Sequence, residues 1–536
     1  MAGYPVSDTI RTFSLTALSI LLLPLSLLAL CLGRIAQYVV AAGPPGSPDQ
    51  RRHQEQEEDA RDRRTVLVTG VGMAKGLTLA RAFHLSGHRV IGADFEAPGI
   101  PCSGRSSRSL SAFYRMPKPD HHHSISGSSS SKADAYVERL VDIVRTDGVD
   151  LWVSCSGVAS AAEDAVAKEA IERRTRCKCI QFDLATTMRL HEKDAFMRET
   201  ARLGLPCPET HTVTSQREIL RILDASSSAA SGQENSNPEK QKKKPKQFIL
   251  KPIGVDDANR GNMTLLPLAT RHETEAHLAR LPVSAANPWI VQQFVPGGAE
   301  YCTHALVVRG QVRCFAACPS AELLMHYQPL PAGSALFQAM LKFTREFVAR
   351  SDTPEEMTGH LSFDFMVEED EVTENGFRRS MYAIECNPRA HTAVVLFARP
   401  GPEMRGMVRA YLSAAGPSKR VNGSSANGDG GEGLELVVPP ADADARYWIG
   451  HDLVSLVVHP AYRLVTGRIA LQEFLAGLLA FFTHVLTWKE GTWEAGDPWP
   501  AVALYHAYWP LSILGAWRRG QRWSRVNVST TKMFGC

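Results

Sequence analysis

The chain has little excess charge of either sign, which bears on the kinds of partner it can bind. Lysine and arginine number 59 and aspartate and glutamate 56, giving a net charge of +3 over 536 residues. That balance argues against a protein built mainly to hold nucleic acid, and we expect no nucleic-acid partner. The composition, 44% hydrophobic and 21% charged, excludes a wholly disordered or fibrous protein. It leaves enough chain for roughly three domains.

The sequence also lacks a cysteine framework. Its 11 cysteines are scattered. The tightest groups, Cys177 with Cys179 and Cys314 with Cys318, have no second pair at the spacing of a zinc site. An odd number of scattered cysteines fits a reducing compartment. We therefore expect neither a cysteine zinc site nor a set of structural disulfides.

Long uncharged runs are few, and the first lies near the N-terminus. Residues 12–33 are uncharged and mostly apolar, and a helix of this length is long enough for a bilayer core of about 30 Å. A cleaved signal peptide is the alternative, but its apolar region is usually about 7–15 residues long. We favour an uncleaved transmembrane anchor within residues 1–64. The arginines that follow it place the rest of the chain in the cytosol, at an endomembrane such as the endoplasmic reticulum.

The C-terminal tail, residues 447–536, is rich in tryptophan and ends in a basic stretch. Seven of the nine tryptophans lie from Trp448 onward, and two apolar segments, 469–488 and 498–517, precede a run of arginines. These segments fit interfacial membrane helices with aromatic and basic side chains at the boundary. A buried helical cap on the globular body explains the same pattern equally well, so both interpretations stay open.

Between these ends the pattern is that of an α/β protein. A strand at residues 66–69, a glycine turn at 70–76, a helix at 77–86 and a strand at 88–94 predict a βαβ unit. The turn could cradle a phosphate, and Asp94 lies near the position that holds a ribose in dinucleotide sites. Its glycine spacing is one residue too long for that fingerprint, so we expect the turn to serve folding rather than an NAD(P)-dependent oxidoreductase.

The most informative run is Glu-Cys-Asn-Pro-Arg-Ala-His at residues 385–391. On an extended segment Glu385 and Asn387 point to one face, where a carboxylate and an amide oxygen suit Mg²⁺. Arg389 falls on the same face and can meet phosphate. Asp364, on a paired strand, adds a second carboxylate. A charged surface hairpin is the alternative, but alternating apolar residues predict that the opposite face is buried: Phe363, Phe365, Ile384 and Cys386.

Nucleotide contacts are expected earlier in the chain. Lys251 ends an apolar strand at 248–251, where its ammonium can hold a phosphate, and Lys193 is a second candidate. A strand at 289–294 runs into a turn whose backbone groups can meet an adenine edge, through Gln293, Phe294 and Val295. Glu300 follows and can face a ribose or a metal ion.

In this order and spacing, the residues resemble the signature of the ATP-grasp superfamily. The resemblance implies an α/β fold with a Rossmann-like pre-ATP-grasp domain at 65–184. An ATP-grasp fold of two α+β lobes would follow at 185–412, with an insertion at 226–246. A linker at 413–446 would then lead to the tail. The chain is similar in particular to the mycosporine-glycine synthase branch of mycosporine biosynthesis, in stretches such as Pro-Trp-Ile-Val-Gln-Gln-Phe-Val-Pro at 288–296 and Leu-Ser-Phe-Asp-Phe at 361–365.

The resemblance implies an ATP-dependent carbon–nitrogen ligase of a secondary-metabolite pathway. ATP would phosphorylate an enol or carboxylate oxygen, and an amine would displace the phosphate. The expected substrates are 4-deoxygadusol and glycine. The main alternative is an amino-acid or peptide ligase acting on a different carboxylate. A non-catalytic membrane scaffold is a further alternative, against which the intact set of acids, asparagine and arginine argues.

The same resemblance assigns roles to the candidate residues. Two Mg²⁺ ions, with Mn²⁺ as a substitute, would be held by Asp364, Glu385 and Asn387. Arg389 would hold the transferred phosphoryl group, and His391 would deprotonate the amine, although a packing role for His391 is equally open. A small-molecule acceptor, an amino acid and a membrane are the expected partners, and a homo-oligomer is compatible with the sequence.

Overall fold

The structure is a computed structural model of the whole chain, and its described residues cover most of the expected globular part. They are residues 6–41, 63–119, 131–155, 157, 160–231, 246–253, 263–320, 325–369, 379–416 and 435–535. Much of the expected insertion and of the expected linker, residues 232–245 and 417–434, lies outside them. The predicted α/β class is confirmed. The described residues form a parallel five-stranded sheet, a four-stranded sheet, an antiparallel three-stranded sheet and two sheets of two strands, with an apolar N-terminal helix and a helical C-terminal region.

The chain forms two compact units. The first comprises Met1–Thr187, Cys302–Ser362 and Pro388–Gly535, and the second comprises Met188–Tyr301 and Phe363–Asn387. The Cα backbone therefore leaves and re-enters the first unit twice.

The first unit begins with a five-stranded parallel sheet in the order β3-β2-β1-β4-β5. Its central strands are continuous apolar runs because helices cover both faces, and Val66, Leu67 and Val68 are fully buried. The predicted βαβ opening is present, whereas β3 was not predicted. The strands are β1 (Thr65–Thr69), β2 (Arg89–Phe95), β3 (Ala112–Met116), β4 (Leu151–Val153) and β5 (Lys178–Ile180), and the helices are α3 (Ala74–Leu85), η1 (Ser103–Ser106), α4 (Ser131–Asp147) and α5 (Ala161–Arg174).

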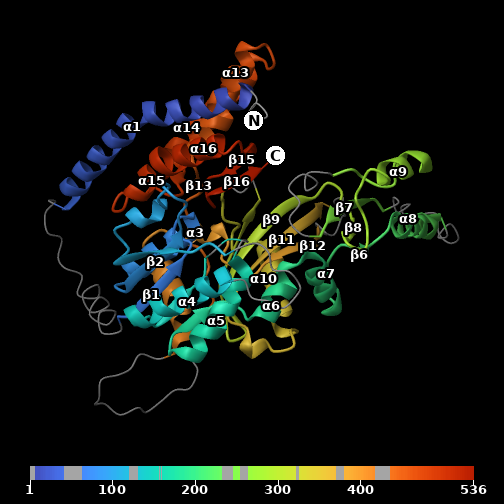
Figure 1. Cartoon of the computed structure of the whole chain (residues 1–536), viewed down its shortest axis with the longest axis horizontal. Coiled ribbons are helices and arrows are strands. Elements are labelled where there is room, and N and C mark those ends of the chain that lie inside the picture. The colour runs from blue at the N-terminus through green and yellow to red at the C-terminus, as the bar shows by residue number, and fades with distance from the viewer. Residues whose placement is uncertain are drawn as a thin grey trace. The chain divides into compact units, whose positions relative to one another are not determined.

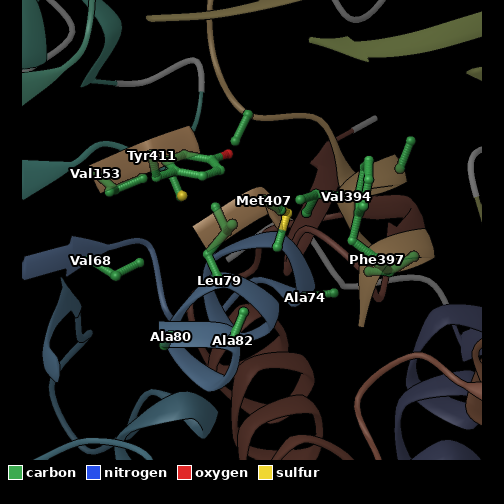
Figure 2. Close-up of a cluster of buried hydrophobic side chains, with 14 of the residues drawn as sticks. Val68, Ala74, Leu79, Ala80, Ala82, Val153, Val394, Phe397, Met407 and Tyr411 are labelled. Atoms are coloured by element: carbon green, nitrogen blue, oxygen red, sulfur yellow. The ribbon is translucent and has the colours of Figure 1, made fainter. Parts of the chain in front are cut away.

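The core of the first unit joins the start of the chain to residues beyond 388. Helix α3 packs on η4 (Thr392–Phe397) and α11 (Pro402–Leu412), which is followed by η5 (Ser413–Ala415). Figure 2 shows Leu79 of α3 beside Met407 of α11, with Val394 and Phe397 of η4 in the same cluster. The segment that follows Asn387 is therefore held in the core by the apolar side chains of η4 and α11.

A second sheet has the order β10-β9-β11-β12. Helix α10 packs on it through Phe337, whose ring meets Phe315 edge to face at 5.1 Å between centroids. The two paired strands that were predicted to carry Asp364 and Glu385 are β11 and β12 of this sheet. The strands are β9 (Ala299–Val308), β10 (Gln311–Pro319), β11 (Gly359–Glu369) and β12 (Arg379–Asn387); the helices between them are α10 (Ala335–Ala349) and η3 (Pro354–Glu356).

The second unit contains a three-stranded antiparallel sheet in the order β6-β8-β7. Its core is formed by Phe248 and Trp289 from the strands and by Ile219 and Leu278 from the helices. The elements are α6 (Leu184–His191), α7 (Lys193–Arg202), β6 (Thr210–Val213), α8 (Gln216–Ser231), β7 (Phe248–Pro252), α9 (Arg271–Leu278) and β8 (Trp289–Gln293).

The two apolar segments of the tail differ in burial, so the cap interpretation is supported for one of them and the membrane interpretation of the other stays a prediction. The segment expected at 498–517 is a cap on the body, with Leu504, Trp509 and Ile513 buried. In contrast, α14 leaves Leu479 and Leu486 70% and 80% exposed. The tail elements are β13 (Arg446–Tyr447), α12 (Ile449–Asp452), η6 (Leu453–Val458), α13 (His459–Val465), α14 (Leu471–Thr487), β14 (Lys489–Glu490), α15 (Trp499–Ala503), η7 (Leu504–Tyr508), α16 (Trp509–Arg518), β15 (Trp523–Asn527) and β16 (Lys532–Gly535).

The N-terminal helix α1 (Val6–Ala41) lies along the tail rather than apart from it (Figure 1). The Ser19 hydroxyl donates to the Tyr505 carbonyl at 2.8 Å, and the Phe13 and Trp517 rings meet edge to face at 5.2 Å. Among the described residues, α1 is the helix long and apolar enough to cross a membrane, over Asp8–Gly33.

Candidate functional site

The acidic set of the second unit lies on β11 and β12, as predicted. Asn387 donates through Nδ2 to Oδ2 of Asp364 at 3.2 Å, so the two side chains share one face. Phe363, Phe365 and Cys386 are buried on the other face, while Ile384 is half-buried. Alternation therefore aims the polar set away from the core, and this argues against a hairpin exposed on both faces.

Lys193 is brought to this set by helix α7, where it is the first residue. Three positions later, Phe196 is fully buried and stacks on Phe363 at 5.8 Å between ring centroids. This contact fixes the helix against β11 and places Nζ of Lys193 3.7 Å from Oε2 of Glu385. The sequence named both residues, and the structure pairs them directly.

Lys251 has a partner that the sequence analysis missed. Its Nζ donates to Oε1 of the buried Gln292 at 2.8 Å. Strand β7 pairs with β8 so that Lys251 lies opposite Ile290, which leaves Gln292 as its diagonal neighbour. The amide of Gln292 also reaches Oγ1 of Thr210 on β6 at 3.3 Å, so it holds the lysine from a fixed position.

The hinge after β8 has fewer backbone groups available than expected. The N–H of Gln293 donates to the Glu209 carbonyl at 2.8 Å, and the N–H of Phe294 donates to the Gln247 carbonyl at 2.7 Å. Val295 is buried in the same turn. The adenine contact that we assigned to all three residues is therefore best sought at Val295. Glu300 is exposed at the start of β9, and its role stays a prediction.

In the first unit, the backbone of the segment that contains Arg389 forms hydrogen bonds with side chains of three different elements. Oγ of Ser362 on β11 donates to the Arg389 carbonyl at 3.0 Å, and Nζ of Lys75 on α3 donates to the Ala390 carbonyl at 2.9 Å. The N–H of His391 donates to Nδ1 of His304 on β9 at 3.2 Å. Burial lowers the pKa of His304 well below its ordinary value, so its neutral ring can accept this bond.

His391 begins the 3₁₀ helix η4 as its N-cap. Its Nδ1 accepts the N–H of Ala393 at 3.1 Å. A neutral imidazole that accepts at Nδ1 carries its proton on Nε2, which then donates rather than accepts. This geometry favours the packing role that the sequence left open for His391, and its role as a base stays a prediction.

Lys75 is a buried lysine whose ionisation is influenced by Arg389. Burial and, second, the charge of Arg389 lower the pKa of Lys75 from 10.5 to about 7. The positive charge of Arg389 therefore disfavours a charged Lys75, and an anion bound at Arg389 would relieve this repulsion.

The glycine turn of the first sheet serves folding, as expected. The N–H of Gly72 donates to Oδ2 of Asp94 at 2.7 Å, and the N–H of Ala74 donates to the Ser529 carbonyl at 2.8 Å. A Cβ at Gly76 would lie 2.3 Å from the Gly70 carbonyl oxygen, so glycine is required there for packing. The donors and the acid that a dinucleotide would need are used within the protein.

Part of the site lies outside the described residues. The ATP-grasp resemblance also implies a loop over the phosphates of ATP after Lys251, at residues 254–261, and this loop belongs to the segment 254–262 that is not described. Gln292, Lys75 and His304 were not singled out from the sequence. The only signals for them were a polar residue inside an apolar strand at 289–294 and a lysine inside the glycine turn.

Comparison with known proteins gives weak structural likenesses. No family model matches the chain, and no curated protein matches it. An N5-carboxyaminoimidazole synthetase from Staphylococcus aureus is similar over 62% of this chain and 71% of its own, with 12% identity and a TM-score of 0.42.

Two further solved structures are similar to the same degree. An L-amino acid ligase from Bacillus licheniformis has 12% identity and a TM-score of 0.37, covering 62% of this chain and 68% of its own. A phosphoribosylglycinamide synthetase from Anaerococcus prevotii has 12% identity and a TM-score of 0.38, covering 61% and 68%. At these values the likenesses carry no argument about activity, so the function proposed for this chain rests on its own residues.

The buried Lys75 gives a prediction for stability. A lysine whose pKa is about 7 when folded and 10.5 when unfolded binds fewer protons in the folded state between these values. Stability therefore rises with pH across that window, by at most about 1.4 kcal/mol per pH unit. The melting temperature of the wild type, relative to that of Lys75→Met, should rise between pH 7 and pH 9. Parallel pH profiles for the two proteins would contradict the buried, neutral lysine.

Proposed function

We propose that this chain is an ATP-dependent carbon–nitrogen ligase of the ATP-grasp type. The observation that carries the proposal is the pairing of the predicted residues in the second unit. Lys193 at the start of α7 lies beside Glu385 of β12. Asn387 of β12 lies beside Asp364 of the adjacent strand β11. Folding of a charged hairpin does not require two acids, an amide and a lysine to lie together on the face opposite its buried apolar residues.

The donor set fits magnesium. Carboxylate and amide oxygens are the ligands that Mg²⁺ prefers, and Asp364, Glu385 and Asn387 would hold the ions that accompany ATP. Bound Mg²⁺ would neutralise charge on the phosphates during transfer. Mn²⁺ has the same preference for oxygen ligands.

The chain's own residues would do the rest. Lys193 and Lys251 add fixed positive charge for the phosphates, and Gln292 keeps the Lys251 ammonium in place. Val295 would meet the adenine edge. Arg389 would bind the phosphoryl group of the activated intermediate. Its carbonyl accepts a hydrogen bond from Ser362, and its positive charge lowers the pKa of Lys75.

For the substrates we propose a cyclohexenone enol as the acceptor, 4-deoxygadusol, and glycine as the amine. This assignment depends on the sequence resemblance to the mycosporine branch. The enol oxygen would take the γ-phosphoryl group of ATP, and the amine nitrogen would then form the new bond as phosphate leaves. An amino-acid or peptide ligase with a carboxylate acceptor is the alternative.

ADP release by the purified full-length protein tests the proposal. A panel of amino acids should be assayed with and without 4-deoxygadusol, and with carboxylate acceptors in a parallel series. We expect ADP release that needs both glycine and 4-deoxygadusol. Release with a carboxylate acceptor instead would support the alternative ligase, and no ATP consumption with any pair would contradict the proposed function.

We also propose that the protein attaches to a membrane with its catalytic body in the cytosol, where ATP and Mg²⁺ are supplied. Leu21 and Leu25 on α1 and Leu479 and Leu486 on α14 are more than half exposed. In Figure 1, α1, α13 and α14 of the first unit lie near one another. Large exposed apolar areas of this kind mark membrane or protein contacts, and arginines such as Arg518 and Arg525 could meet an anionic surface.

Replacing Leu479 and Leu486 together by glutamate should lower recovery of the protein with membranes, because two exposed apolar side chains that would contact lipid become charged. Flotation of full-length protein on anionic vesicles measures this. Leu85→Glu is the matched control, since Leu85 is 56% exposed on α3, away from these helices. Equal flotation of all three proteins would contradict attachment through α14. A glycosidase-sensitive mass shift of the full-length protein, through the sequons that begin at Asn262, Asn422 and Asn527, would place the body in the lumen instead.

A further inference from the structure

Three side chains from distant parts of the first unit converge outside the proposed catalytic site. His326 follows β10, Asp452 ends α12, and His484 lies in the last turn of α14. Nε2 of His326 lies 2.8 Å from Oδ1 of Asp452, and Nδ1 of His484 lies 2.6 Å from Oδ2 of the same carboxylate. One ligand atom from each residue lies within 4.8 Å of the other two.

The carboxylate at the centre is completely enclosed. Asp452 is 0% exposed, and the side chains of His326 and His484 are 10% and 15% exposed. The Trp488 ring adds an apolar wall, with its centroid 4.3 Å from that of His484 and 5.2 Å from that of His326. A carboxylate buried this deeply is costly unless positive charge compensates it.

The backbone holds the three groups in place before any ion binds. Tyr327, next to His326, exchanges two backbone hydrogen bonds of 2.9 Å with Arg446. The strand β13 that contains Arg446 pairs with β14, which follows α14 directly. Asp452 lies five residues after Tyr447 of β13. The scaffold is therefore preorganised in the way that a metal site requires.

We propose that His326, Asp452 and His484 bind one zinc ion. Imidazole nitrogens and a carboxylate oxygen are common zinc ligands, whereas Mg²⁺ prefers oxygen ligands alone. Zinc holds such atoms at about 2.0–2.2 Å, which places tetrahedral ligands roughly 3.3–3.5 Å apart. Small rotations of the two rings achieve this from the observed separations. A water molecule would complete the coordination.

The ion would join α14, which has an exposed apolar face, to α12 and to the segment that follows β10. It is independent of the proposed ATP site, and its test does not depend on ligase activity. The cluster has no sequence motif, because His326 and Asp452 are 126 residues apart and Asp452 and His484 are 32 apart. Spacing rules for zinc sites look for closer pairs.

Metal analysis of the full-length protein tests the site. Wild-type protein that has been loaded with Zn²⁺ and dialysed should retain about one zinc per chain, and Co²⁺ in its place should give the visible absorption of a tetrahedral site. His484→Gln and His326→Gln should each lose both signals. His211→Gln is the control and should retain them, because the ring of His211 contacts one exposed carboxylate, Glu209, at 2.9 Å.

Retention of zinc by wild type at no more than the level of folded His484→Gln would overturn the proposal. The three residues would then be a hydrogen-bonded triad. If His484→Gln does not fold, His484→Cys keeps a ligand and should add a thiolate-to-Co²⁺ charge-transfer band in the near ultraviolet. Folded His484→Cys without that band would also overturn it. A chelator should lower the melting temperature of wild type more than that of either variant.

Discussion

Asp364→Asn should reduce the rate of ADP formation by about a hundredfold or more, because electrostatic groups at phosphoryl-transfer sites contribute on this scale. The substitution removes a charge but almost no volume, and Asn387 still has a polar partner at 3.2 Å. Glu385→Gln should have a similar effect and should also release Lys193 from its ion pair. ADP release at saturating ATP and ordinary Mg²⁺ is the measurement.

The control for both variants is Glu275→Gln, which neutralises an exposed carboxylate on α9 that pairs only locally with Arg271 at 2.9 Å. Its activity should equal that of the wild type. Near-normal turnover of Asp364→Asn or Glu385→Gln would remove that residue from the metal set. Partial rescue by higher Mg²⁺ would support the set, because weakened metal affinity is the expected defect.

Lys251→Met should weaken ATP binding by about 10- to 150-fold, which corresponds to the roughly 1.5–3 kcal/mol of a charge-assisted hydrogen bond. The apolar stem keeps its packing on β7, while Gln292 loses the ammonium that it accepts from. Isothermal titration with ATP and Mg²⁺ measures the change directly, without any assumption about the acceptor or the amine.

A nearby lysine provides the comparison. Lys246 is an exposed residue before the same strand, paired with Glu209 at 2.6 Å, and Lys246→Met should leave ATP affinity unchanged. Equal loss in both variants would indicate a general charge effect. Unchanged affinity in Lys251→Met would show that this lysine does not contact the nucleotide.

Local pattern was enough to predict most of the strands and the face that carries the acids. The alternation of Phe363 and Phe365 with Asp364 specifies which side of β11 is buried, because a strand has a period of two. The same period of two predicted that Glu385 and Asn387 lie on one face of their strand. These features depend on residues one or two apart, which the sequence displays directly.

Features set by distant contacts could not be predicted in this way. Lys75 and Ala390 are 315 residues apart, and their hydrogen bond exists only once α3 packs on η4. The partner of Lys251 depends on the register between β7 and β8, which side-chain pattern alone leaves open. The two apolar tail segments have similar compositions, and only the contacts of the second with the body separate a cap from an exposed helix.

The bond from Ala74 to the carbonyl of Ser529 has a consequence for the order of folding. The turn that opens the first sheet is completed by Ser529, far along the chain, and Arg81 of the same helix pairs with Asp497, 416 residues away. Contacts at such separations form slowly, because a long loop of chain must close first. We therefore expect the first sheet to be closed late in folding, only after these distant residues have reached α3.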